Sequence, residues 1–241
     1  MGEALLPGAR EVLAALRADG RRVAFLSNKP LQTAAEYAAK LTRLGIPTPA
    51  EAVISTARVL GEHLAGIDPG APVFVIGEPP LIAELARHGF DVRPDHRVRW
   101  VVIAFDRTFD YAKLNTALQA VKGGARLIAT NPDRTCPTPD GEIPDCAGMI
   151  AAVEAVTNTK VEVTVGKPSP IILRSALATL GLAAEQCVMV GDRIETDIVM
   201  GRELGLATVL VLSGITRADD PRIAEVRPDL VLRSVGELIE P

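Results

Sequence analysis

The chain has 241 residues, of which 48% are hydrophobic, and its formal net charge is −4. This length suffices for one large domain or two modest ones around a sizeable apolar core. The acidic balance argues against nucleic acid as the main partner, because nucleic-acid-binding proteins favour a basic face. The longest apolar runs, such as residues 208–212, are far too short to span a membrane. Since the N-terminus has no basic-then-apolar signal pattern, the expected compartment is the cytoplasm.

The first part of the chain alternates between expected helices and strands. Glycines at positions 20 and 45 end two of the helical patterns. Such alternation indicates a parallel, doubly wound α/β sheet. The expected elements are a helix over 8–19, a strand over 23–26, a helix over 33–44, a strand over 52–55 and a helix over 56–64.

A second alternating block follows and has its own apolar faces. Because it repeats the strand-helix-strand pattern, we expect an inserted α/β cap domain at 70–165 and a discontinuous core domain at 1–69 and 166–241. The expected elements are strands over 73–76, 100–104, 126–129 and 161–165, helices over 80–88, 111–121 and 147–156, and a loop rich in proline and aspartate over 131–144.

The first fold is expected to resume at Lys167. Ser169 can cap the following helix, Pro170 fits its first position, and Gly181 ends it. The remaining expected elements are a strand over 187–190, a helix over 196–204, a strand over 208–212 and a last strand over 230–232.

An acidic pair follows the apolar run at 187–190. The run ends in Gly191-Asp192, and Asp197 comes at the start of the next expected helix. Open α/β sheets bind ligands at the carboxyl edge of their strands. Two acids there suit a hard cation such as Mg²⁺. The alternative is a strand-end aspartate plus an acid favoured by the helix dipole.

Two further segments place polar groups at strand ends. Lys167 lies in the turn Gly166-Lys167-Pro168, and an apolar strand ends in Ser27-Asn28. A hydroxyl and free backbone N–H groups at such a position can hold an anion. Each segment alone is more often a surface lysine or an ordinary loop, but three such segments at strand ends are much less expected by chance.

The three cysteines show no zinc spacing. Cys187 lies in an expected strand and is most simply a small core residue. Cys136 and Cys146 flank the expected loop and could be exposed thiols, and we expect no catalytic role for them.

These segments resemble motifs II, III and IV of the haloacid dehalogenase-like phosphohydrolases. The resemblance is to subfamily IIA, which has a large α/β cap and includes 4-nitrophenyl-phosphatase-like and phosphoglycolate-phosphatase-like enzymes. It covers essentially the whole chain and implies a Rossmann-like core. The matching segments are Ser27-Asn28, Gly166-Lys167-Pro168, Gly191-Asp192 through Asp197, and the cap segment Ala129 to Asp133 with Pro139-Asp-Gly141 after it.

The resemblance implies roles for the core residues. Asp192 would bind Mg²⁺, and Asp197 would be an outer-shell acid or a helix-start cap. Lys167 would neutralise the nucleophile and the phosphate. Ser27 and the Asn28 backbone would bind the phosphoryl group of a small phosphorylated substrate.

The resemblance also implies roles for the cap. The segment that carries Asn131, Asp133 and Arg134 would close over the substrate and exclude water. Related enzymes often form homodimers through the cap, so a homodimer of this kind is expected as well.

The family's motif I, an Asp-x-Asp that supplies the nucleophile and the general acid, has no counterpart here. Residues 1–6 contain no aspartate, and the acid pairs Asp106/Asp110 and Asp219-Asp220 have the wrong spacing. In the family, that strand lies centrally, between the strands that end here at Ser27 and Gly191.

We therefore expect a Mg²⁺-dependent phosphatase that is inactive in this N-terminally shortened form, with translation starting upstream in a longer reading frame. One alternative is a pseudoenzyme that binds a phosphorylated metabolite. Another is an unrelated doubly wound binding protein, in which Lys167 would lie far from Asp192 and Ser27.

Overall fold

The computed structural model describes residues 4–138 and 140–239 and contains a five-stranded parallel sheet with the strand order β4-β3-β5-β6-β9. This arrangement confirms the expected α/β class. The strands are β3 (Pro72–Ile76), β4 (Asp91–Val92), β5 (Trp100–Ile103), β6 (Arg126–Ala129) and β9 (Val163–Thr164).

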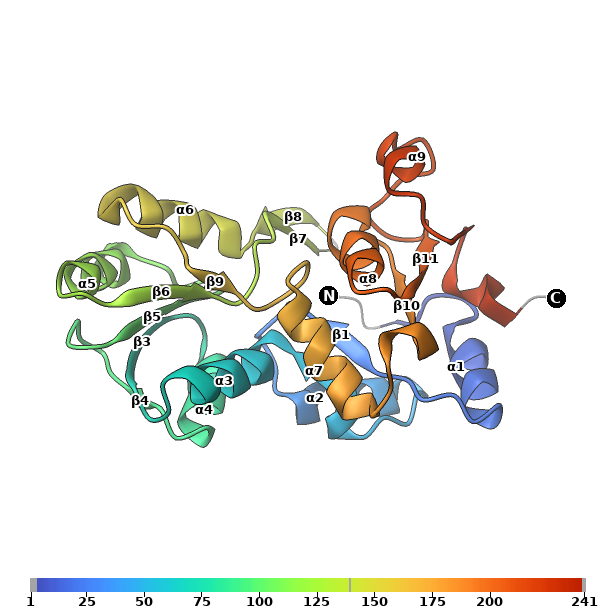
Figure 1. Ribbon diagram of the computed structural model, residues 1–241, viewed down its shortest axis with the longest axis horizontal. Coiled ribbons are helices and arrows are strands. Elements are labelled where there is room, and N and C mark those ends of the chain that lie inside the picture. Colours follow the sequence, from blue (N-terminus) through green and yellow to red (C-terminus); the bar gives the residue numbers. More distant parts are fainter. Residues whose placement is uncertain (1–3, 139, 240–241) are drawn as a thin grey trace.

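Helices cover both faces of this sheet (Figure 1). Successive strand residues point to opposite faces. Accordingly, Val73 and Val75 belong to one apolar cluster, while Phe74 and Ile76 belong to another. The first cluster includes residues of α3 (Thr56–Ile67) and α4 (Pro79–Arg87), and the second includes residues of α5 (Tyr111–Lys122) and α6 (Cys146–Thr157).

The other parallel strands form two smaller sheets. Strand β1 (Phe25–Ser27) pairs with β2 (Val53–Ser55), and β10 (Val188–Gly191) pairs with β11 (Ala207–Val211), which pairs with β12 (Leu230–Leu232). These strands all come from before residue 70 or after residue 166. The exact division into core and cap at these residues stays a prediction.

Strands β1 and β10 each stand at the edge of their sheet. Among the described residues, β1 pairs only with β2, and β10 pairs only with β11. Val188 is 57% exposed and Val190 is 37% exposed, which is high for valines in a parallel strand. These two strands therefore present unpaired backbone edges, and they are the strands between which the family's motif I strand would lie.

The helices around the smaller sheets follow the expected punctuation. Helix α2 (Ala34–Arg43) starts with a capping box in which Thr33 and Glu36 exchange hydrogen bonds. Helix α7 (Pro170–Leu180) is capped by Ser169 and ends at Gly181, whose φ is 62°. The remaining helices are α1 (Ala9–Ala18), α8 (Val199–Glu203) and α9 (Arg222–Val226).

Three local expectations were wrong. The loop expected over 131–144 contains a β-hairpin, β7 (Thr135–Thr138) and β8 (Gly141–Pro144), whose prolines masked the strand pattern. Residue 139 of that segment lies outside the described residues. The helix expected over 196–204 starts as a π-helical turn, Ile194–Ile198, before α8. Cys136 and Cys146 are buried, with 3% and 0% of their surfaces exposed.

No helix in residues 4–138 and 140–239 is long and apolar enough to cross a membrane.

Candidate active site

Asn28 joins the loop after β1 to the turn after β9. Its Oδ1 accepts a hydrogen bond from the Lys167 backbone N–H at 2.8 Å, and its Nδ2 donates to the Lys167 carbonyl at 3.0 Å. The side chain is therefore held from both ends, and the residue is only 8% exposed. This two-way contact brings residues 139 positions apart in the sequence to one place.

Gly166 allows this close approach. A Cβ added there would lie 2.4 Å from the Thr130 carbonyl oxygen and 2.6 Å from Asn28 Oδ1. The Gly166 N–H also donates to the Thr130 carbonyl at 2.7 Å. Because no side chain fits, glycine at this position is a steric requirement of the junction.

Lys167 and Asp197 form a largely buried ion pair. Lys167 Nζ lies 2.7 Å from Asp197 Oδ1, and the two side chains are 17% and 3% exposed. The other oxygen, Asp197 Oδ2, accepts from the Arg193 N–H at 3.1 Å. A Cβ on Gly191 would come within 2.3 Å of the Asp197 Cβ, so the strand end packs directly against the acid. Asp197 therefore links the motif that follows β10 to the turn that follows β9.

Asp192 is fixed by the segment that follows β11. Its Oδ2 accepts from the Ile215 N–H at 2.9 Å, and its carbonyl accepts from the Thr216 N–H at 3.0 Å. Gly214 lies so close that a Cβ there would be 2.0 Å from Asp192 Oδ2. The carboxylate is thus oriented by backbone groups rather than by another side chain.

The acids fit a Mg²⁺ ion only in part. Mg²⁺ takes one or two carboxylates and completes its shell with water and substrate phosphate oxygens. Asp192 supplies one carboxylate, whereas Asp197 is engaged by Lys167. In the described parts of the chain, no three acid, histidine or cysteine side chains cluster in a way that could hold a metal ion.

Ser27 ends β1 directly opposite Ser55 of β2. Its Oγ accepts from the Lys29 N–H at 3.2 Å. Burial raises the pKa of Tyr37, and a hydrogen bond with Ser27 opposes that rise. The hydroxyl of Ser27 therefore belongs to the same loop network as Asn28.

One of the three expected cap residues, Asp133, contacts the core loops directly, and Asn131 reaches them only through Asp133. Asp133 Oδ2 accepts from Asn28 Nδ2 at 2.9 Å and from Asn131 Nδ2 at 3.0 Å. Asp133 Oδ1 lies 3.3 Å from Arg193 Nη1. Arg134 is exposed, and its contact in this network is a backbone one: its carbonyl accepts from the Asp145 N–H at 3.0 Å.

Sequence reasoning missed two charged members of this network. Arg193 contacts Asp133 and also donates to the Thr135 carbonyl at 3.4 Å. The sequence signal that could have pointed to Arg193 was its position directly after Asp192. Asp145 caps α6 and accepts from Asn131 Nδ2 at 3.1 Å. Burial raises the pKa of Asp145, against hydrogen bonds from the Cys146 N–H and from Asn131.

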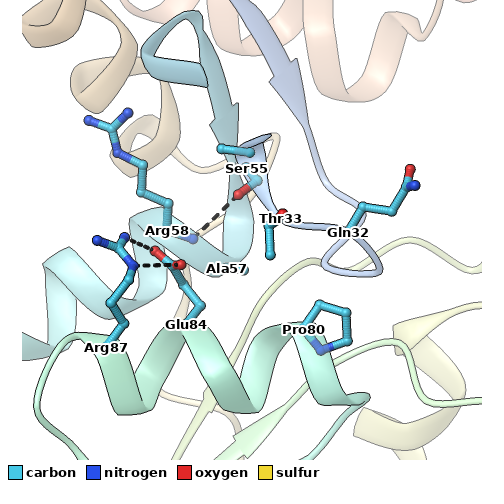
Figure 2. A pocket seen from close by; sticks show the side chains of 9 residues that line it. Gln32, Thr33, Ser55, Ala57, Arg58, Pro80, Glu84 and Arg87 are labelled. Atoms are coloured by element: carbon cyan, nitrogen blue, oxygen red, sulfur yellow. Dashed lines mark hydrogen bonds and ion pairs between the residues drawn. The ribbon is translucent and has the colours of Figure 1, made fainter. Parts of the chain in front are cut away.

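Figure 2 shows a small pocket that is lined by other residues. Its volume is about 40 Å³, room for little more than water. Its two arginines are already paired, Arg58 with Glu62 and Arg87 with Glu84. The lining residues include Gln32, Thr33, Ser55 and Pro80 and none of Asn28, Lys167, Asp192 or Asp197. We assign no ligand to it.

The fold and these motif contacts are those of one enzyme class. A family model described as haloacid dehalogenase-like hydrolase matches residues 1–91, and one described as HAD-hydrolase-like matches residues 164–238. The chain belongs to the haloacid dehalogenase-like hydrolases, subfamily IIA, and by this relationship it is a phosphomonoester hydrolase. This membership rules out an unrelated doubly wound binding protein.

Its relatives are named phosphatases. The chain is 38% identical to the sugar-phosphatase AraL of Bacillus subtilis, over 98% of this chain and 87% of that protein. It is 34% identical to the dihydroxyacetone phosphatase of Corynebacterium glutamicum, over 98% and 85%. The solved structure of p-nitrophenyl phosphatase from Archaeoglobus fulgidus matches with a TM-score of 0.92 and 32% identity, over 99% of this chain and 93% of that one.

Proposed function

We propose that this protein is built for Mg²⁺-dependent hydrolysis of a small phosphorylated metabolite, of the sugar phosphate, phosphoglycolate or 4-nitrophenyl phosphate type. The observation that carries the proposal is the junction of Asn28, Lys167 and Asp197, which joins the loops after three strands. Phosphoryl transfer depends mainly on positioning and charge neutralisation, and this junction supplies both.

Each core residue has a role in the proposal. The Lys167 ammonium neutralises charge on the phosphate, and Ser27 with the Asn28 backbone binds phosphoryl oxygens. Asp192 holds Mg²⁺, which supplies further neutralisation of the phosphate charge. Asp197 positions Lys167 through the 2.7 Å ion pair. The positive charge of Lys167 is thus held at the carboxyl edge of the strands.

The cap residues act as a cover in the proposal. We take 70–165 as the cap and 1–69 with 166–241 as the core. The hydrogen bond from Asn28 to Asp133 and the ion pair from Arg193 to Asp133 support a cap segment that sits against the core loops. Asn131 and Asp133 would then line the substrate side, while the exposed Arg134 would be free to reach an incoming phosphate ester.

The attacking carboxylate is the part that these residues do not supply. The 241 residues contain no strand-end Asp-x-Asp, and in the described residues β1 and β10 both keep an unpaired edge. A lysine, a metal ligand and a hydroxyl stabilise charge but do not replace the covalent step. We therefore propose that this 241-residue polypeptide does not turn over, and that a strand ending in Asp-x-Asp between β1 and β10 would complete the site.

The test compares two polypeptides with and without Mg²⁺. The 241-residue protein should hydrolyse 4-nitrophenyl phosphate no faster than buffer. A version with an in-frame strand ending in Asp-x-Asp ahead of residue 1 should show Mg²⁺-dependent turnover, and Asp192→Ala in that version should abolish it. Robust metal-dependent turnover by the shorter protein would show that the nucleophile is already present among the 241 residues and would contradict the proposal.

The second candidate function is a pseudoenzyme that binds a phosphorylated metabolite. The observation in its favour is the intact Asn28–Lys167–Asp197 junction in a sequence without Asp-x-Asp. Its signature would be calorimetric binding of a sugar phosphate that Lys167→Ala weakens, together with no turnover by the extended protein on sugar phosphates, nucleotides and phosphoglycolate.

We also propose a homodimer through the cap. The support is apolar exposure on its helices, since Tyr111 of α5 is 84% exposed and Val156 of α6 is 44% exposed. Light scattering that shows a monomer at high concentration would remove this proposal.

A further inference from the structure

Lys29 and Cys136 make the closest sulfur contact in the described parts of the chain. Lys29 Nζ lies 2.7 Å from Cys136 Sγ. The other sulfur contacts, those of Cys146 with Thr130 and with Ile103 and that of Cys136 with the Pro137 carbonyl, are 3.6 to 3.9 Å long. The distance of 2.7 Å between Lys29 Nζ and Cys136 Sγ is therefore shorter than the other sulfur contacts. It is about the distance that a single bridging atom would span.

Both groups are held in place by their surroundings. The Lys29 N–H donates to Ser27 Oγ at 3.2 Å, and the Lys29 carbonyl accepts from the Tyr37 hydroxyl at 3.2 Å. Cys136 lies within β7, opposite Ile143 of β8, and only 3% of its surface is exposed. The pair therefore connects the loop after β1 to the hairpin across 107 positions of sequence.

The other two cysteines lack this setting. Cys146 contacts a hydroxyl and a carbonyl instead of an amine, and burial raises its pKa to about 12, so its thiolate is scarce. Burial also raises the pKa of Cys187. Cys136 is thus the cysteine that combines a closely held amine with a fixed position beside the candidate active site.

We propose that Lys29 and Cys136 form a reversible covalent crosslink, in which one oxygen atom bridges Nζ and Sγ, when the protein meets hydrogen peroxide. The thiol first reacts with one peroxide to give a sulfenic acid and one water. The sulfenic acid and the neutral amine then react with a second peroxide, which forms the N–O bond and releases two waters. Sulfur and nitrogen are oxidised, and the two peroxide O–O bonds are reduced.

The crosslink would tie the hairpin to the loop that carries Ser27 and Asn28. Arg193 already donates to the Thr135 carbonyl in the same hairpin, at 3.4 Å. A covalent tie next to this contact would hold the cap segment against the core loops. This consequence rests on the proposed function, because it matters for activity only if the cap must open for substrate.

The test measures mass and does not depend on activity. The 241-residue protein is treated with hydrogen peroxide and examined by intact-mass spectrometry, with and without dithiothreitol. We expect a species that has gained one oxygen and lost two hydrogens and that returns to the starting mass with the reductant. Proteolysis should then yield one crosslinked peptide pair that contains Lys29 and Cys136.

Matched variants make the test specific. Cys136→Ser and Lys29→Arg should each abolish the species, whereas Cys187→Ser and Lys160→Arg should keep it. Mapping the peptides in the wild-type protein covers the case in which a variant folds poorly. A gain of oxygen without loss of hydrogen, a loss of hydrogen without gain of oxygen, or a crosslink that survives Cys136→Ser would overturn the proposal.

Discussion

The ammonium of Lys167 lies 2.7 Å from Oδ1 of Asp197, while Asp197 Oδ2 accepts a backbone hydrogen bond from Arg193. The carboxylate is almost fully buried, and among the described residues these two neighbours compensate its charge. A buried charge that loses its partner is costly, because the desolvation penalty remains. Removing Lys167 and removing Asp197 should therefore cost different amounts of stability.

Lys167→Met should destabilise the protein by about 3 kcal/mol, because it leaves Asp197 buried and unpaired. Asp197→Asn should cost less, since an amide oxygen can still accept from the Arg193 N–H and the Lys167 side chain is 17% exposed to water. The double variant should be more stable than Lys167→Met alone. Urea unfolding of all four proteins gives the coupling free energy, and strictly additive losses would contradict the buried-pair account.

Gly166→Ala should cost about 2 kcal/mol, because the new methyl group meets a carbonyl oxygen and Asn28 Oδ1, neither of which can move without breaking the junction. Gly66→Ala is the matched control. Gly66 lies in α3, and nothing stands within 4 Å of an added Cβ. That change should stabilise the protein by about 0.5–1 kcal/mol, since alanine favours helix. Equal effects in thermal unfolding would argue against the steric role of Gly166.

The helices and strands that the sequence predicted well were those whose ends are marked by residues close by in the chain. Helix α7 was predicted to its ends because Ser169, Pro170 and Gly181 each act within one turn of the chain. The hairpin β7–β8 was missed because its strands contain prolines and their pairing depends on contacts between strands. Strand β4 was missed because it has only two residues, Asp91–Val92, and owes its existence to β3.

The candidate site likewise contains residues that a local sequence signal marks and residues that depend on contacts between distant segments. Ser27, Asn28, Lys167, Asp192 and Asp197 could be named from the sequence because each lies at the end of a strand or in the segment that follows one. The reach of Arg193 across to Asp133 could not, since it depends on how the hairpin packs against the loop after β10. Gly214 was missed for a similar reason, because its role is a close approach to Asp192 from another segment.

Asp145 should make stability fall as the pH rises. Burial raises its pKa in the folded protein, so the folded state holds this proton more tightly than the unfolded chain does. The contribution of Asp145 to the free energy of unfolding is then largest at acid pH. It declines from about pH 4 upward, until the carboxyl of the folded protein has also lost its proton. Asp145→Asn keeps an acceptor for Asn131 and the Cys146 N–H but does not titrate, so it should lack this decline.

Urea unfolding of the wild type and Asp145→Asn at several pH values measures this difference. The variant should gain stability relative to the wild type as the pH rises. Asp145→Ala is the control, since it also lacks the titrating carboxyl but loses the cap of α6, so it should be less stable than Asp145→Asn by about 1 kcal/mol at every pH. A constant difference between the wild type and Asp145→Asn would mean that this carboxyl does not titrate differently in the folded state.

Arg193→Ala should loosen the hairpin without unfolding the protein. The guanidinium holds Asp133 at 3.3 Å and the Thr135 carbonyl at 3.4 Å, so its removal frees the start of β7 from the loop after β10. A charge-assisted contact contributes about 1.5–3 kcal/mol, which corresponds to at least about a tenfold faster local opening. Amide hydrogen exchange by mass spectrometry should show this increase over β7 and β8 and little change over β3 and β5. Arg126→Ala is the matched control, because Arg126 pairs with Glu162 and lies over the Trp100 ring instead. If both variants accelerate hairpin exchange equally, or if neither does, Arg193 does not hold the hairpin to the core loops.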